Sequence, residues 1–282
     1  MKDFLKKKAK GLLRRSRFAV EAFLKGPQAA PKRKLAIGRS MQEIMEYFSQ
    51  AGFRPGTVID VGFNTGTDGL YGVFTDCAYL AVDPLQESEP FLKAQKAKTP
   101  RFDYFLAAAG PTEGELELGV SECFGGSSAF LKDKLPTRKV PMLSLDHMAR
   151  QIVAQGPYLI KVDVQGAELD VLRGAKQILD ETEVLILETR LCPFKGAPEI
   201  ADVVSFLKKN GFSLFEVFNP LYRPGDGAMG QLDVVAVRTD GFFRTADKYR
   251  LGGFRTKEQQ KKNTEAKLKS RGRRISALEQ SP

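Results

Sequence analysis

The chain is poor in the residues that build metal centres and disulfide frameworks. It has a single histidine, His147, and three cysteines, Cys77, Cys123 and Cys192, which show no CxxC spacing. An odd, unpatterned set of thiols indicates a reducing compartment and argues against structural zinc, and one imidazole excludes a histidine-rich metal site. Long apolar runs are also missing, since a stretch such as Tyr158–Ile160 is far too short to cross a bilayer. We therefore expect a cytoplasmic protein without a transmembrane helix.

The positive charge of the chain is concentrated at its two ends. Residues 1–34 hold 12 Lys/Arg and two acidic residues, and residues 241–282 hold 12 Lys/Arg and four acidic residues. Residues 35–240 hold 20 basic and 28 acidic residues, so the formal net charge of +10 does not describe the middle of the chain. We predict a basic arm (1–34), one domain (35–240) and a basic, partly disordered tail (241–282). Such a distribution is weak evidence for a nucleic-acid substrate.

The N-terminal arm has the pattern of a basic amphipathic helix. Apolar residues such as Leu5, Leu12 and Val20 fall on one side, with lysines and arginines around them. A helix of this kind can lie on an anionic membrane surface, although a solvated arm or a helix docked on the body is also consistent with the pattern. Because a long apolar core and a small-residue cleavage site are missing, we do not expect a secretory signal.

From residue 56 onward, short β-rich runs alternate with helical patterns. The predicted strands are 57–61, 78–82, 104–107, 158–162, 184–187, 212–217 and 232–237. The predicted helices are 41–49, 167–179 and 198–209. Continuous apolar strands are typical of sheets covered on both faces, and this alternation predicts a parallel, doubly wound α/β sheet. Ligands of such sheets bind beyond the carboxyl ends of the strands.

Candidate ligand-binding residues follow the first two strands. The turn from Asp60 through Gly62, Asn64 and Gly66 allows a close approach of the backbone to a ligand. It is not a dinucleotide G-x-G-x-x-G, because Asn64 stands at the second glycine position, and a P-loop Gly-Lys-Ser/Thr does not follow. Asp83, about 20 residues further on, is suited to accept hydrogen bonds from ribose hydroxyls, whereas a simple turn before Pro84 is the alternative. Together these features predict nucleoside binding.

The segment Leu159–Ala175, with Asp163, Gly166 and Glu168, resembles the signature of FkbM-family methyltransferases. Residues 58–66, 81–84 and 140–146 are similar to further motifs of the family in the same order, so the resemblance covers about residues 50–240. It implies a Rossmann-like, seven-stranded, mostly parallel sheet that binds S-adenosylmethionine. It also implies methyl transfer, commonly to a hydroxyl of a sugar, glycan, lipid-linked saccharide or polyketide.

The resemblance also implies roles for individual residues. The glycine turn with Gly62, Asn64 and Gly66 would approach the amino-acid part of the cofactor, and Asp83 would bind the ribose. Ala107 and Ala108 would lie near the adenine, and Asp163 near the methyl group and the acceptor. The chain departs from the family where an acidic pair often follows Leu145, because it has Asp146-His147 there.

Three residues are candidates for removing the acceptor proton. Asp163 comes first, as a base or as a ligand of a divalent ion such as Mg²⁺, with binding of the cofactor's amino group as the alternative. Glu188 ends the fifth strand in the same layer. His147 is the third candidate, although it falls in the first turn of a helix that Asp146 is expected to cap. Glu168 opens a helix, where the helix dipole explains an acidic residue about as well as a chemical role does.

Two further segments have open interpretations. The loop 123–128 is suited to a lid or to an ordinary hairpin connection. Residues 219–222 superficially resemble the Asn-Pro-Pro-Tyr motif of nucleic-acid amino-methylating enzymes, but they follow a later strand, and Pro220 predicts a loop. The leading hypothesis is therefore an O-methyltransferase acting on a saccharide or glycolipid acceptor. The alternatives are an RNA or DNA methyltransferase, or a non-catalytic membrane-surface protein on the same scaffold.

Overall fold

The computed structural model describes residues 38–122 and 125–244. The predicted basic arm (1–34), nearly all of the predicted tail (241–282), and Cys123 and Phe124 of the predicted lid loop lie outside these residues. Among the residues described, no helix is long and apolar enough to cross a membrane.

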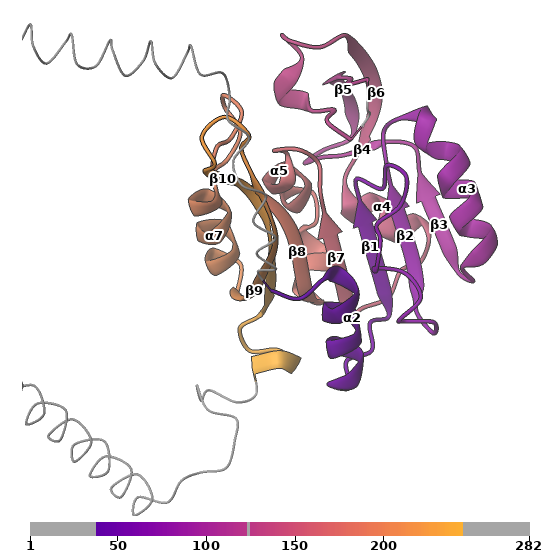
Figure 1. The fold of residues 1–282 in the computed structure, drawn as a ribbon. Coiled ribbons are helices and arrows are strands. Elements are labelled where there is room, and N and C mark those ends of the chain that lie inside the picture. Colours follow the sequence, from indigo (N-terminus) through magenta and orange to yellow (C-terminus); the bar gives the residue numbers. More distant parts are fainter. Residues whose placement is uncertain (1–37, 123–124, 245–282) are drawn as a thin grey trace, which may run out of the picture. The chain divides into compact units, whose positions relative to one another are not determined.

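The main sheet has seven strands in the order β3-β2-β1-β7-β8-β10-β9 (Figure 1). They span β1 (Thr57–Val61), β2 (Ala78–Val82), β3 (Phe102–Phe105), β7 (Tyr158–Val162), β8 (Thr182–Arg190), β9 (Phe212–Tyr222) and β10 (Met229–Arg238). Only β10 runs against its neighbours in this sheet. The prediction of a seven-stranded, mostly parallel sheet is confirmed, and β1, β2 and β7 have the predicted bounds.

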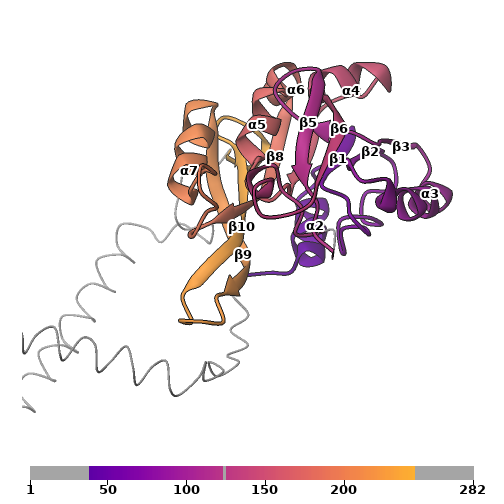
Figure 2. The same ribbon diagram turned by 90° about the horizontal axis from the view of Figure 1, so that it is seen from above.

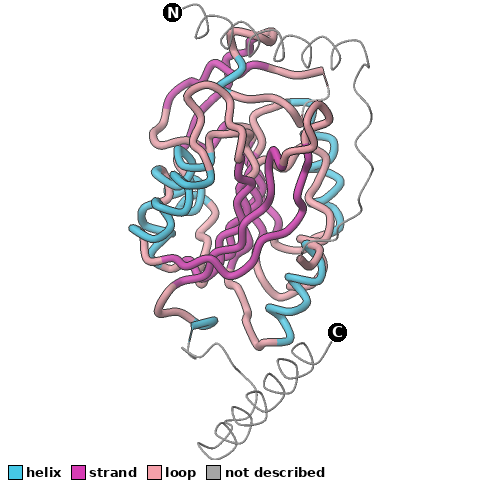
Figure 3. The backbone as a smooth tube through the Cα atoms, turned by 60° about the vertical axis from the view of Figure 1, so that its left-hand side comes forward, coloured by secondary structure: helices cyan, strands magenta, loops and turns pink. Residues whose placement is uncertain are grey.

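Helices cover both faces of this sheet, so the strands lie between two helical layers (Figure 3). One face carries α2 (Met41–Gln50) and α3 (Glu89–Lys98), and the other carries α4 (Leu145–Gln151), α5 (Glu168–Arg173), α6 (Lys176–Asp180) and α7 (Ile200–Lys209). Short 3₁₀ turns lie at Gln86–Ser88, Ala129–Leu131 and Phe242–Arg244. Every residue of β1 and β7 is buried, as expected for strands that contribute side chains to a core on each side.

Helix α2 begins with a capping box. Ser40 Oγ accepts from the Glu43 backbone N–H at 3.3 Å, and the Ser40 N–H donates to Glu43 Oε2 at 2.7 Å. A cap of this kind contributes about 1 kcal/mol to the stability of a helix. The buried side of α2 packs Phe48 against Phe243, with ring centroids 4.6 Å apart. The packed body therefore extends at least to Arg244.

A second, three-stranded sheet lies above the carboxyl ends of β1 and β2, as Figures 1 and 2 show. Its order is β4-β6-β5, with β4 (Ala108–Ala109), β5 (Gly114–Gly119) and β6 (Thr137–Leu143). It was not predicted, although β5 has a clear signal: Glu115, Leu116, Glu117 and Leu118 alternate polar and apolar, which is typical of a half-buried strand.

The helix predicted over 167–179 is two helices. Gly174 lies between them. Glycine is required there, because a Cβ would lie 2.0 Å from the carbonyl oxygen of Gly110. The second helix, α6, is capped by Asp146, whose carboxylate accepts from the backbone N–H groups of Gln177 and Ile178 at 3.0 Å. The expectation that Asp146 caps its own helix is therefore wrong. Ser144 caps α4 instead, accepting from the His147 N–H at 3.3 Å.

The segment 219–222 is also not the loop that was predicted. It forms the end of β9, which is the edge strand of the main sheet. An edge strand tolerates Pro220 because its missing N–H is not needed for a ladder hydrogen bond. Asn219 adopts a left-handed backbone with φ 51°, where the pairing between β9 and β10 is irregular.

Candidate functional site

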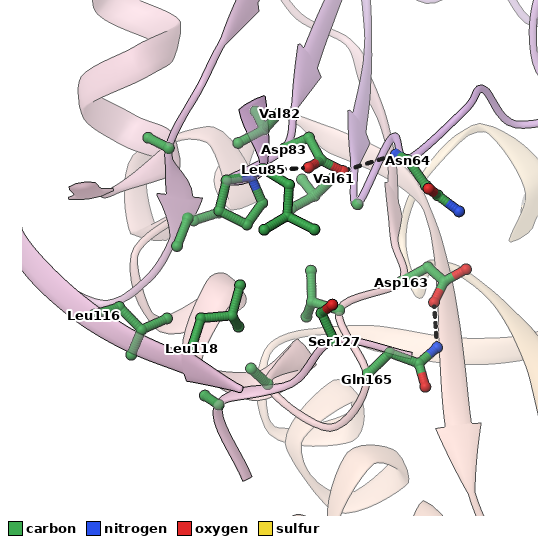
Figure 4. Close-up of a pocket in the computed structure, with 18 of the residues that line it drawn as sticks. Val61, Asn64, Val82, Asp83, Leu85, Leu116, Leu118, Ser127, Asp163 and Gln165 are labelled. Carbon is green, nitrogen blue, oxygen red and sulfur yellow. Dashed lines mark hydrogen bonds between the residues drawn. The ribbon is translucent and has the colours of Figure 1, made fainter. Parts of the chain in front are cut away.

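Two cavities adjoin each other at the carboxyl ends of the strands. The first, here called the narrow cavity, encloses about 730 Å³ of empty space, part of it open to solvent, and lies under the three-stranded sheet (Figure 4). The second, here called the wide cavity, encloses about 1700 Å³ of empty space, part of it open to solvent, and is bordered by the start of α2 and the end of β9. Gly62, Asn64 and Asp163 line both cavities. These three residues therefore form the boundary between the two cavities.

The glycine turn after β1 lies against the loop after β7. Gly62 has φ 82°, and a Cβ there would lie 1.8 Å from the carbonyl oxygen of Asp163. Glycine is therefore required at this position both by conformation and by space. The turn brings the Asn64 N–H within 2.7 Å of Asp83 Oδ2.

Asp83 lies in the wall of the narrow cavity and is 5% exposed. Its second oxygen accepts from the Leu85 N–H at 2.9 Å, so backbone donors fix the carboxylate from two sides (Figure 4). Burial raises the pKa of Asp83, and the two backbone hydrogen bonds oppose that rise. Each carboxylate oxygen has a second acceptor position, so the group can still accept hydrogen bonds from a ligand.

Much of the remaining wall of the narrow cavity is apolar, although Asn64, Ser127, Asp163 and Gln165 also line it. Ala107 and Ala108, which follow β3, line it on one side. Leu116 and Leu118 of β5 line it from the second sheet (Figure 4). Small side chains on one side and leucines on the other suit a flat, weakly polar ring. Sequence reasoning included the two alanines and missed the leucines.

Asp60 and Lys161 form a buried ion pair beneath the glycine turn. Asp60 Oδ2 accepts from the hydroxyls of Thr67 and Tyr71 at 2.8 Å, and Lys161 Nζ lies 3.3 Å from Asp60 Oδ1. The same ammonium donates to the Gly62 carbonyl at 3.1 Å. Burial acts to lower the pKa of Lys161, but Asp60 and Asp163 outweigh it and raise the pKa, so this lysine stays charged. Asp60 lines neither cavity and supports the turn from below.

The wide cavity is polar and charged. Its lining includes Arg39, Thr67, Asp68, Lys161, Asp163, Asn219, Tyr222 and Asp233. Gly66, which was expected to contact the cofactor, lines this cavity and not the narrow one. The Asp163 side chain is 35% exposed, and its oxygens lie 3.2 Å from Gln165 Nε2 and 3.6 Å from Lys161 Nζ. Asp163 is therefore accessible and partly neutralised.

Glu188 is held by neighbouring side chains and lines neither cavity. It accepts from Gln231 Nε2 at 2.9 Å and from Gln165 Nε2 at 3.1 Å, and Arg190 lies 3.3 Å away. Burial, followed by the charge of Asp163, raises the pKa of Glu188 to about 8. This arrangement favours a role in holding the loop around Gln165.

His147 lies apart from the other candidates. Its Nδ1 is 3.4 Å from Glu113, and its Nε2 is 2.7 Å from the Gln151 amide on the same helix. It lines neither cavity. Glu168 is buried and accepts from the Gly166 N–H at 2.9 Å, so it holds the backbone of the loop that carries Gln165.

Sequence reasoning missed Lys161 and Asp233 as members of the site. Both had a visible signal, because each is a charged residue inside an otherwise apolar strand, Tyr158–Val162 for Lys161 and Leu232–Val237 for Asp233. Such residues are costly to bury unless they are paired or used. Within the described ranges, no three His, Cys, Asp or Glu side chains gather in a way that could hold a metal ion. The Mg²⁺ ion stays a prediction that these residues do not support.

The order of the strands, the single reversed strand and the cavities at the crest define a Rossmann-like domain of the class I methyltransferase type. Residues 60–214 match the model of the methyltransferase FkbM domain. The chain therefore belongs to the FkbM methyltransferase family.

Solved structures with a similar fold include other methyltransferases. A methyltransferase FkbM from Methylobacillus flagellatus KT shares 16% identity and a TM-score of 0.45, over 70% of this chain and 48% of that chain. This chain thus spans about half the length of that protein. Magnesium protoporphyrin IX methyltransferase from Synechocystis PCC 6803, solved with bound SAM, shares 14% identity and a TM-score of 0.39, over 70% of this chain and 77% of that one. None of the curated proteins compared with this chain matches it.

Proposed function

We propose that the chain is an S-adenosylmethionine-dependent O-methyltransferase whose acceptor is a hydroxyl of a sugar, glycan or glycolipid. The observation that carries this proposal is the position of Asp163 and the glycine turn at the boundary of two cavities of different character. One cavity suits a nucleoside, and the other is large and polar enough for a hydroxylated acceptor.

The residues of the narrow cavity fit the nucleoside part of the cofactor. Asp83 is fixed by two backbone N–H groups and retains free acceptor positions for ribose hydroxyls. Ala107, Ala108 and Leu118 offer apolar contacts for the adenine. Gly62, Asn64 and Gly66 would border the amino-acid part, where the turn reaches the wide cavity.

When bound, S-adenosylmethionine supplies a methyl group on a sulfonium sulfur, which keeps the carbon–sulfur electron pair as an acceptor oxygen bonds to the carbon. The protein has to align the acceptor with that carbon, and alignment can lower a barrier by up to about 7–11 kcal/mol. Asp163, which borders both cavities, is close to the reacting groups in this arrangement. Its negative charge favours the positive charge that the cofactor brings into the site.

The wide cavity supports a saccharide acceptor. Its wall combines the hydrogen-bonding groups of Asn219 and Asp233 with the apolar surfaces of Phe218 and Tyr222. Sugars present hydroxyls at their edges and C–H groups on their faces, so such a mixed wall is complementary to them. The predicted membrane contact of residues 1–34 would bring a lipid-linked saccharide near the enzyme.

Calorimetry with S-adenosylhomocysteine tests the cofactor assignment. We expect binding with a Kd in the micromolar range, and the absence of binding at millimolar ligand would remove the cofactor from the proposal. Methyl transfer is then tested with radiolabelled S-adenosylmethionine and a set of free sugars, extracted glycolipids and RNA. Label in RNA, with none in saccharides, would contradict the acceptor class.

A further inference from the structure

We propose that Asp233, on the wall of the wide cavity, binds the acceptor hydroxyl and takes up its proton during methyl transfer. This inference rests on the proposed function and adds a catalytic residue to it. It starts from the register of the main sheet. Asp60 on β1 lies beside Lys161 on β7, and Glu188 on β8 lies beside Asp233 on β10.

These four residues point to the same face of the sheet. Their neighbours two positions away along each strand, Val58, Leu159, Ile186 and Val235, all pack in the core beneath α2 and α3. Because side chains two apart on a strand share a face, the four ionisable residues form a staggered row across four adjacent strands at the crest, in which Glu188 lies two residues beyond Ile186, the register partner of Lys161. A row of charges at this depth is costly unless each member is paired or used.

The members of the row differ in how many hydrogen-bond and ion-pair partners they have. Asp60 is neutralised by Lys161 and accepts from two hydroxyls, and Glu188 is surrounded by two amides and Arg190. Asp233 differs, because its hydrogen-bond partner within the described residues is the Asn219 amide, 3.1 Å from Oδ2. Asp233 also lines the wide cavity, whereas Asp60 and Glu188 do not. It is therefore the member of the row that can accept a hydrogen bond from a ligand.

Asn219 gives Asp233 a fixed orientation. The left-handed backbone of Asn219 lies at the irregular pairing of β9 with β10 and turns its amide toward the carboxylate. This explains the use of an asparagine, which tolerates that backbone better than most residues. Both side chains border the cavity on the side of β9 and β10, and Asp163 borders it on the side of the glycine turn.

The surroundings of Asp233 suit it to act as a base. Asp163 acts through its negative charge. Burial, followed by the charge of Asp163, raises the pKa of Asp233 to about 6, and Lys161 and the Asn219 hydrogen bond oppose the rise. A base is most effective when its pKa is near the working pH, and a positioned base contributes about 10²–10⁴-fold to a rate. In the proposed step, the acceptor oxygen bonds to the methyl carbon as the carbon–sulfur bond breaks, and its electron pair stays on sulfur, which leaves as S-adenosylhomocysteine. The acceptor proton passes to Asp233 and from there to water in the open cavity.

The test uses two cofactor analogues and needs no identified acceptor. S-adenosylhomocysteine lacks the methyl group, and sinefungin carries an ammonium group in place of the methylated sulfonium. An ammonium aimed at the acceptor site should gain from a nearby carboxylate, so we expect the wild type to bind sinefungin about tenfold more tightly at pH 7.5. Asp233→Asn should reduce that preference about three- to tenfold and change the S-adenosylhomocysteine affinity less than twofold. Asp103→Asn, an exposed carboxylate on β3, is the matched control.

The unmodified protein provides a second measurement. The preference for sinefungin should fall as the pH is lowered through about 6, because Asp233 becomes protonated. A preference that is unchanged in Asp233→Asn, or constant between pH 7.5 and pH 5, would overturn the assignment. An equal loss of affinity for both analogues would also overturn it, by making Asp233 a cofactor-binding residue. Failure of the wild type to bind S-adenosylhomocysteine would instead contradict the proposed function.

Discussion

The two cavities are built from different parts of the chain and from different chemistry. The narrow cavity is formed by the middle of the sequence, by Asp83, the alanines after β3 and the leucines of β5. The wide cavity joins residues 38–43, before and within α2, to residues 218–222 at the end of β9, and its wall carries several charges. The narrow cavity is characterised by apolar walls and the buried carboxylate of Asp83, and the wide cavity by several charged side chains, with Asp163 shared between them. Under the proposed function, binding the cofactor and activating the acceptor are therefore separate tasks within this domain.

The boundary between the cavities should be the most sensitive point. Gly62→Ala introduces a Cβ 1.8 Å from the carbonyl oxygen of Asp163 at a left-handed φ of 82°. We expect a loss of about 3 kcal/mol or more in the free energy of unfolding, measured by urea denaturation. Gly225→Ala is the control, because nothing lies within 4 Å of its added Cβ. Equal stabilities for the two variants would contradict the close contact between the two loops.

The ionisable residues beside the wide cavity are tested through Glu188, the cross-strand neighbour of Asp233. Its pKa of about 8 in the folded protein lies above the ordinary 4.5, so the folded state holds a proton that the unfolded state releases. Stability should therefore fall as the pH rises between these two values. From about pH 5 to pH 8, the wild type should lose about 2–4 kcal/mol more than Glu188→Gln. Denaturation at both pH values measures this, with the exposed Glu117→Gln as control; parallel curves for wild type and Glu188→Gln would refute it.

The carboxylate of the narrow cavity is tested by Asp83→Ala. This change removes an acceptor for ribose hydroxyls and leaves the Asn64 and Leu85 N–H groups unpaired. The affinity for S-adenosylhomocysteine should fall at least tenfold, or about 1.4 kcal/mol, by calorimetry. Asp103→Ala should leave the affinity unchanged, and an unchanged affinity in Asp83→Ala would remove the ribose assignment.

The smallest effect is expected at the apolar roof of the narrow cavity. Leu116→Ala removes part of the surface that β5 turns toward the predicted adenine. We expect S-adenosylhomocysteine to bind roughly threefold more weakly, since only part of one side chain leaves the contact. The exposed Leu221→Ala on β9 is the control. If the two variants behaved alike, the second sheet would not cover the cofactor.

The central strands were predicted from the sequence more accurately than the helices around them. Strands β1, β2 and β7 were predicted with correct bounds, because continuous apolar runs bounded by turns leave little ambiguity. Helix α3 was missed because it buries only Leu92 and so lacks an apolar period. The break at Gly174 depends on a contact with Gly110, which is distant in the sequence and has no local signal.

The place of the site was predicted from the sequence, but not every residue in it. Position after a strand correctly indicated that Gly62, Asp83 and Asp163 lie around one cavity. The same rule selected Glu188 and missed its cross-strand neighbour Asp233, because β10 runs antiparallel to β8 and Asp233 lies in the first half of its strand. Which of the two faces a cavity depends on Gln165 and Gln231, which cover Glu188 from other segments. Their roles in catalysis stay predictions until the experiments are done.

The division of the cavities along the chain has a consequence for protein engineering. Most of residues 38–43 and 218–222 line the wide cavity and none lines the narrow one, so an exposed position among them, such as Tyr222, can be varied while the segment 62–118 stays untouched. Under the proposed function, a library at such positions would alter the acceptor side of the site and leave the residues proposed to bind the methyl donor in place.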